Sequence, residues 1–233
     1  MDHRRGVVAS LTGGKPSFVE VYGRGSIVDM AQGPRRDLNI SGLNALDIRT
    51  RKPNGQKWDF NKASDRQEAR RLVIELEPTW LIGSPPCTVF SSLQNLNFSK
   101  MPKEKVKEIL EEGRRHLHFV VSLYRLQLSH GRHFLHEHPC TAASWRDPWV
   151  HKLTEDPRVH VTVSDQCEYG LRTPDKDGNL VLAMKPTKRA TSSIHIASRR
   201  SKRCTGTHKH QHLVGGSCCS CSVLPECLNH RDP

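Results

Sequence analysis

Residues 80–87 read Trp80-Leu81-Ile82-Gly83-Ser84-Pro85-Pro86-Cys87 and give the clearest indication of the fold class. Three apolar residues in a row predict a short strand covered on both faces, as in a parallel sheet. Pro85 and Pro86 then restrict the backbone and predict a stiff turn that presents Cys87. A thiol at the carboxyl end of a strand is a candidate nucleophile, because a thiolate attacks well and can later leave. A buried structural cysteine beside a proline turn is the alternative interpretation.

Apolar runs and helical stripes alternate along the rest of the chain. Because parallel strands need crossover connections, this alternation predicts an α/β fold with a doubly wound, mostly parallel sheet. The strands that we expect besides 80–82 lie at 18–22, 43–48, 134–135 and 159–163. The expected helices are a short one ending near Gln32, one that ends at Pro78, and a long one over 103–129.

The 233 residues, 35% of them hydrophobic, are enough for one buried core. We expect a loose segment over 1–16, one domain over 17–184 and a basic extension with cysteines and histidines over 185–233. The extension differs from the domain because eight lysines and arginines, and no acidic residue, lie between Lys185 and Leu224.

The net charge of +12 predicts a polyanionic partner, and nucleic acid is the most common one. No apolar run approaches the roughly 20 residues that a membrane span needs. The charged residues at 1–5 lead into no apolar stretch of the kind found in secretory signals. We therefore expect a monomeric intracellular protein, nuclear or cytoplasmic, with reduced cysteines and no membrane partner.

Two glycines follow the first predicted strand, in the stretch from Glu20 through Tyr22 and Gly23 to Gly25. Glycines at a strand-to-helix turn let a ligand approach the backbone, and the helix N-terminus adds positive charge. Asp47 ends the second strand, at about the distance from Gly25 where an acid binds ribose hydroxyls. This spacing favours a nucleotide-like ligand, and an ordinary turn with a solvated acid is the alternative.

Glu137 stands between His136 and His138 at the end of the fourth predicted strand. A carboxyl group held there is a candidate general acid, because burial would raise its pKa. Two histidines and a glutamate on a solvated loop are the alternative. Gln166 and Arg172 follow the fifth strand. Ligands of doubly wound sheets bind at these strand ends.

In chain order these motifs resemble the DNA cytosine-5 methyltransferase family, over about residues 18–172. The most specific match is the family's Pro-Pro-Cys motif. The corresponding segments are Glu20 through Ser26 for the glycine-bearing motif, Pro85-Pro86-Cys87 with Phe90-Ser91, Glu137-His138-Pro139 for Glu-Asn-Val, and Gln166 with Arg172 for a later motif.

The resemblance implies transfer of a methyl group from S-adenosylmethionine to C5 of cytosine in DNA, with RNA as the other possible substrate. It implies that the Cys87 thiolate adds to C6 while Glu137 binds the base at N3, with Gln166 and Arg172 as further catalytic residues. The target base would be flipped out of the duplex. The residues implied for the cofactor are Glu20, Tyr22, Gly23, Gly25, Asp47 for the ribose, Asp59 for the adenine, and Pro85.

Three other functions fit parts of the pattern. A catalytically inactive nucleic-acid-binding module, including a retroelement-derived one, would keep the fold and the charge. An amino-methyltransferase has a similar strand-end proline motif, but with an aromatic residue where Cys87 stands. A thiol hydrolase could use Cys87 with His136 or His138, although it leaves the glycine turn unexplained.

Cysteines and histidines also gather in the basic extension, at Cys204, His208 and His210 and again from Cys218 to Cys227. Thiolates and imidazoles are ligands for zinc. The spacing matches no standard zinc finger, so from the sequence we expect thiols and solvated histidines here, and no metal.

Overall fold

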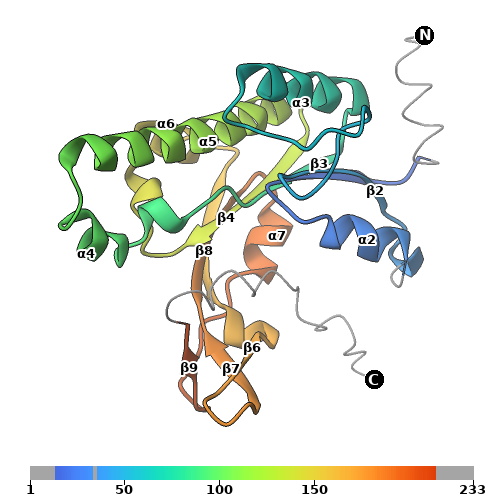
Figure 1. Cartoon of the computed structure of the whole chain (residues 1–233). Coiled ribbons are helices and arrows are strands. Elements are labelled where there is room, and N and C mark those ends of the chain that lie inside the picture. Colours follow the sequence, from blue (N-terminus) through green and yellow to red (C-terminus); the bar gives the residue numbers. More distant parts are fainter. Residues whose placement is uncertain (1–13, 34–35, 214–233) are drawn as a thin grey trace.

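The computed structural model describes residues 14–33 and 36–213, and most of them build one α/β unit (Figure 1). Its six-stranded sheet has the order β2-β1-β3-β4-β8-β5. Strands β1 to β4 pair in parallel, whereas β8 is antiparallel to both β4 and β5. The prediction of an α/β fold with a mostly parallel sheet is therefore confirmed. The six strands are β2 (Ser41–Leu46), β1 (Ser17–Val21), β3 (Trp80–Gly83), β4 (His133–Pro139), β8 (Pro186–Thr191) and β5 (His160–Asp165).

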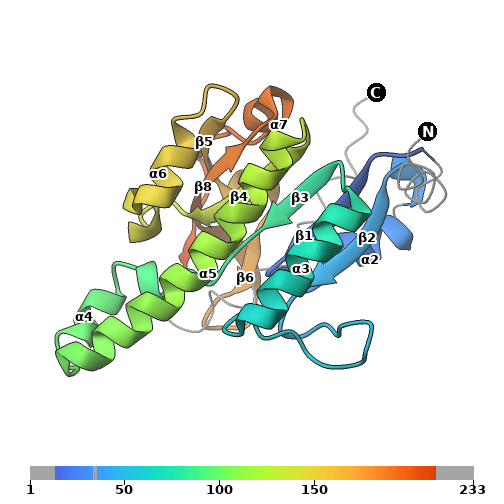
Figure 2. The same ribbon diagram turned by 90° about the horizontal axis from the view of Figure 1, so that it is seen from above.

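Helices cover both faces of this sheet. Figures 1 and 2 show α3 (Ala63–Leu76), α5 (Lys103–Ser129) and α6 (Pro148–Thr154) on one face, and α2 (Ser26–Gln32) and α7 (Ile194–Arg199) on the other. Among the residues that the structure describes, no helix is both long and apolar enough to cross a membrane. The remaining helical elements are short: α4 (Gln94–Phe98), η1 (Arg36–Leu38), η2 (Thr88–Phe90), η3 (Ala143–Arg146) and η4 (Gln166–Tyr169).

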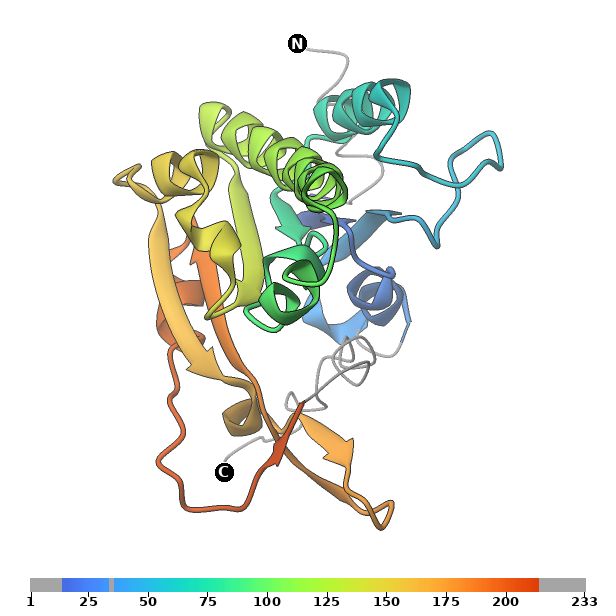
Figure 3. The ribbon, with the colours of Figure 1, turned by 60° about the vertical axis from the view of Figure 1, so that its left-hand side comes forward.

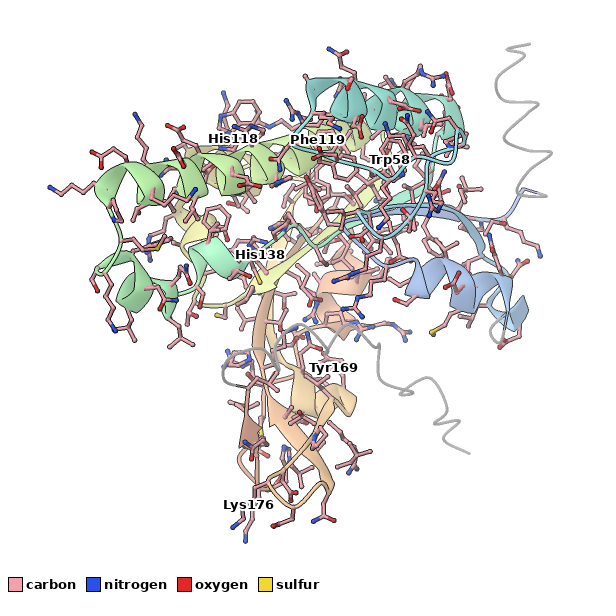
Figure 4. All side chains as sticks on the ribbon, in the orientation of Figure 1. Trp58, His118, Phe119, His138, Tyr169 and Lys176 are labelled. Carbon is pink, nitrogen blue, oxygen red and sulfur yellow. The ribbon has the colours of Figure 1, made fainter. Side chains whose placement is uncertain are left out.

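The hydrophobic core lies on both sides of the sheet because successive strand residues point to opposite faces. All five residues of β1 are buried. Val19 and Val21 belong to the larger cluster, between the sheet and the layer of α3 and α5, which also contains Trp58 and Phe119 (Figure 4). Phe18 points the other way and belongs to a smaller cluster that includes residues of α2. A strand covered on both faces reads as a continuous apolar run, and Trp80-Leu81-Ile82 in β3 is such a run, which is why the sequence revealed this strand.

A second, three-stranded sheet projects away from the first (Figure 3). It consists of the antiparallel hairpin β6 (Arg172–Pro174) and β7 (Leu180–Met184), with β9 (Gln211–His212) parallel to β7. The sequence predicted none of these strands. The domain was predicted to end at residue 184. Strand β8 of the main sheet and helix α7 both lie after this residue, in the predicted extension. Most of the predicted loose segment and the cysteines from Cys218 to Cys227 lie outside the described residues.

Candidate active site at the carboxyl edge of the sheet

Most of the residues singled out in the sequence follow the carboxyl ends of the parallel strands. The carboxyl ends of parallel strands lie along one edge of a sheet, where open α/β sheets bind their ligands. The residues that the chain supplies there are Glu20, Tyr22, Gly23 and Gly25 from β1 and its turn, Asp47 after β2, Pro85 and Cys87 after β3, Glu137 near the end of β4, and Gln166 after β5.

The turn that carries Cys87 is fastened to β4 by a buried histidine. The Pro85 carbonyl oxygen accepts a hydrogen bond from His138 Nε2 at 2.9 Å, and His138 Nδ1 lies 2.6 Å from Ser144 Oγ. Because a carbonyl can only accept, this contact assigns the imidazole proton to Nε2. Burial lowers the pKa of His138 to about 4. Cys87 itself is half-buried and directly precedes η2 as its N-cap residue, with its carbonyl accepting from the Phe90 amide at 3.0 Å. The role of His138 in anchoring this turn could not be predicted from the sequence pattern.

Glu137 is held by a residue of η4, which follows β5, and by a residue of strand β8. Gln166 Nε2 donates to Glu137 Oε1 at 3.2 Å and to Thr187 Oγ1 at 3.0 Å. Arg189 Nη2 lies 3.2 Å from Glu137 Oε2, and its other terminal nitrogen donates to Ser164 Oγ. The structure thus brings together two of the predicted site residues, Glu137 and Gln166. It adds a buried arginine that sequence reasoning missed, because β8 was not predicted as a strand.

The glycine turn after β1 is shaped by Glu20. This side chain is only 3% exposed, and its Oε1 accepts hydrogen bonds from the Ile27 and Val28 amides, both at 2.8 Å. Glu20 therefore caps the N-terminus of α2 from the preceding strand. Burial raises the pKa of Glu20, and the amide hydrogen bonds oppose this shift. A Cβ atom at Gly23 would overlap Glu20 Oε2, so a larger residue here would displace the Glu20 carboxylate. Gly25 has a φ of +86°, a conformation that favours glycine.

Removal of the Glu20 cap should be measurable in urea unfolding. We expect Glu20→Ala to lower the free energy of unfolding by about 1–2 kcal/mol, the usual cost of a lost helix cap. Glu20→Gln keeps an oxygen that can accept both amides and removes a buried charge, so its stability should stay within about 0.5 kcal/mol of the wild type. An equal loss in both variants would show that the charge, and not the acceptor, stabilises the turn.

The other residues assigned to the cofactor already have partners within the protein. Tyr22 has a φ of 59°, and its hydroxyl lies 2.9 Å from His116 Nδ1 on α5. Burial raises the pKa of the Tyr22 hydroxyl. Asp47 is 6% exposed, and its Oδ1 accepts the Arg49 amide at 2.9 Å, which leaves capacity for further donors. Asp59 lies on the loop before α3, where its carboxylate accepts the backbone N–H two residues later.

Arg172 lies apart from the other site residues. It belongs to β6 of the second sheet and is exposed, and its Nη1 donates to the Leu180 carbonyl oxygen at 3.3 Å. A cavity of about 340 Å³ lies next to η2, and neither Cys87 nor Glu137 is among the residues that line it. Phe90 and Ser91 line it on the side of η2, and it also contains Arg114 and Arg146.

One edge of the sheet therefore joins a thiol on a fixed turn, a carboxylate held by arginine and glutamine, and two buried acids at the ends of β1 and β2. Such a set can combine nucleophilic attack with binding of a ligand that carries hydroxyl or cationic groups. No protein-family model matches the chain, and no curated protein matches it either.

Proposed function

We propose that this protein transfers a methyl group from S-adenosylmethionine to C5 of cytosine in DNA. The observation that carries the proposal is the 2.9 Å hydrogen bond from His138 to the Pro85 carbonyl. It joins the turn of Cys87, the proposed nucleophile, to the strand of Glu137, which would bind the base. The sheet, with β8 antiparallel between β4 and β5, agrees with the Rossmann-like methyltransferase fold that the sequence resemblance implies.

The residues beside β1 and β2 fit the proposed cofactor by their chemistry. Glu20 and Asp47 are buried carboxylates at the ends of two neighbouring parallel strands. S-adenosylmethionine carries ribose hydroxyls, an ammonium group and a sulfonium, and carboxylates bind donors and cations of this kind. When bound, the cofactor would supply an electrophilic methyl group. The turn of Gly23 and Gly25 would hold its methionine part, Asp47 its ribose and Asp59 its adenine.

Cys87 would begin the chemistry by forming a bond from its sulfur to C6 of cytosine. The electrons of the C5–C6 double bond then make C5 nucleophilic, which the free base is not. Glu137 would hydrogen-bond the Watson–Crick edge of the base, with Arg189 and Gln166 holding the carboxylate in place. After methylation, loss of the C5 proton to a base re-forms the double bond and breaks the C6–S bond. The Cys87 thiolate is thereby regenerated.

The proposed substrate is a cytosine turned out of a DNA duplex. An enzyme cannot reach C6 of a stacked base, so the base has to enter a pocket. Next to η2, Arg114, Arg146 and Asp147 line a cavity, and its two arginines can bind phosphate groups of the DNA. The net charge of +12 supports a polyanionic substrate as well.

Trapping on a fluorinated base tests the proposal. Full-length protein is mixed with S-adenosylmethionine and duplex DNA that contains 5-fluorocytosine, whose C5 fluorine blocks the final elimination. We expect a protein–DNA adduct that survives denaturation. Cys87→Ser should abolish it, because serine is far less nucleophilic at neutral pH. Cys140→Ser is the matched control, since Cys140 is also half-buried and should leave the adduct unchanged.

Other results would favour the alternative functions. Methyl transfer without a trapped adduct would favour methylation of an exocyclic amino group. DNA binding without measurable affinity for S-adenosylmethionine would favour an inactive binding module. An adduct that persists in Cys87→Ser would exclude Cys87 as the nucleophile.

A further inference from the structure

Four side chains that bind soft metals converge where the end of β5 meets the loop before β9. Cys167 comes from η4, whereas Cys204, His208 and His210 come from the loop. Figure 3 shows this loop, in red, running from α7 to β9. One ligand atom from each of the four residues lies within 4.8 Å of all the others. Cys167 is buried and the other three are half-buried, so the cluster is largely shielded from solvent.

The distances within this cluster match a tetrahedral metal site. Zn–S and Zn–N bonds of about 2.3 and 2.0–2.1 Å imply S···N edges of about 3.6 Å in a tetrahedron. Cys204 Sγ lies 3.6 Å from His208 Nε2 and 3.3 Å from His210 Nε2. Each of the two imidazoles thus directs its Nε2 atom toward Cys204 Sγ. Cys167 and Cys204 are thiols and not a disulfide, so both sulfurs can bind a metal.

The backbone around the cluster is fixed from several sides. Asp165 Oδ2 accepts the Cys204 amide at 2.9 Å and Arg203 Nε at 2.8 Å, which attaches the loop to the end of β5. The Gly206 amide donates to Cys204 Sγ at 3.3 Å. Gly206 can form this turn because its φ is +77°, a conformation that favours glycine. Hydrogen bonds from N–H groups to sulfur stabilise a thiolate ligand, as outer-shell contacts do in metal sites generally.

We propose that Cys167, Cys204, His208 and His210 bind one structural zinc ion. Two thiolates and two imidazoles in a tetrahedron are typical of zinc. All four coordination positions would be taken by protein, so the ion has a structural role and not a catalytic one. The ion would hold the loop between α7 and β9 against η4. Gln166, the residue next to Cys167, contacts Glu137, so the ion would also support one side of the candidate active site.

Metal analysis of the full chain tests this site. The four cysteines outside the described residues could bind zinc themselves, so the background is a chain with Cys218, Cys219, Cys221 and Cys227 all replaced by serine. After loading with Zn²⁺ and gel filtration, we expect one zinc ion per chain in this background. Adding Cys204→Ser should weaken Zn²⁺ binding by more than about 100-fold, since even lost outer-shell contacts cost 10–100-fold. Adding Cys140→Ser instead should leave the zinc content unchanged.

Cobalt spectra keep the proposal testable if Cys204→Ser fails to fold. In the same background, His208→Cys retains four ligands and should bind Co²⁺ with a stronger thiolate-to-cobalt absorption band. His208→Ala should weaken binding. The proposal fails if the background binds no zinc, if the stoichiometry stays the same in Cys204→Ser, or if mass spectrometry finds Cys167 and Cys204 joined as a disulfide. None of these readouts depends on methyl transfer.

Discussion

Gly83→Ala should lower the free energy of unfolding by about 3 kcal/mol, the upper range for overpacking a well-filled core. The added Cβ would overlap the Tyr124 hydroxyl and lie 2.8 Å from Val120 Cγ2. Tyr124 is fully buried and cannot easily move away. Its hydroxyl is 3.1 Å from His136 Nδ1, and its ring stacks on Phe134 with a centroid distance of 4.6 Å. The glycine at the end of β3 therefore allows α5 to pack closely against the sheet.

Urea unfolding of a second variant separates this overlap from a backbone effect. Combining Gly83→Ala with Tyr124→Phe removes the overlapping hydroxyl, so the double variant should recover part of the lost stability. If the losses in free energy of unfolding of the two single variants simply add in the double variant, the Tyr124 hydroxyl is not the cause of the loss in Gly83→Ala. A loss below about 1 kcal/mol in Gly83→Ala would show that the interior can rearrange. Because the turn of Cys87 starts at the next residue, the folded Gly83→Ala protein should also trap fluorinated DNA less efficiently.

The elements predicted correctly are those whose sequence pattern is local. The long helix was expected over 103–129, and α5 spans Lys103–Ser129, because its apolar stripe repeats over many turns after Pro102. Strand β8 was missed because its lysine and arginine resemble a solvated basic tail. Arg189 is nevertheless only 4% exposed, since Glu137 and Ser164 bind its guanidinium. Whether a charged residue is buried depends on a partner far away in the sequence, and single-sequence patterns do not contain this information.

The same limit applies to the candidate site. Strand ends could be located from the sequence, and this was sufficient to place Glu137 near Gln166. The contacts that fix these strand ends, from His138 and Arg189, depend on how distant segments pair. The sequence attributed Gly23 to a bound cofactor, and the structure adds that a Cβ atom at this position would overlap Glu20 Oε2. The proposed zinc cluster remained hidden because Cys167 is separated from the other three residues by the β6–β7 hairpin and β8.

Mild acid should destabilise the protein, because His136 and His138 are buried as neutral imidazoles. Burial lowers the pKa of His138 to about 4 and that of His136 well below its usual value. In the unfolded chain both have an ordinary pKa near 6.5. From about pH 6.5 down to 4, the unfolded chain therefore binds protons that the folded protein excludes, and the free energy of unfolding falls with the pH. His138 alone should cost about 2 kcal/mol at pH 5, and His136 adds to this loss.

Urea unfolding at pH 7.5, 6 and 5 measures this dependence, and two variants assign it to the buried pair. His136→Leu combined with Tyr124→Phe removes one titrating imidazole together with its hydrogen-bonding partner, so neither leaves an unsatisfied group behind. This variant should lose a large part of the pH dependence, because one of the two fully buried imidazoles is gone, whereas His116, whose pKa burial also lowers, still contributes. His195→Gln, at an exposed position on α7, should keep all of it. If the free energy of unfolding changes with pH by the same amount in the wild type and in both variants, the acid sensitivity arises outside the buried histidine pair. A weaker dependence of the free energy of unfolding on pH in the double variant alone assigns the acid sensitivity to the histidine pair. Because His138 of this pair binds the Pro85 carbonyl, the pair then also limits the pH range in which the Cys87 turn stays in place.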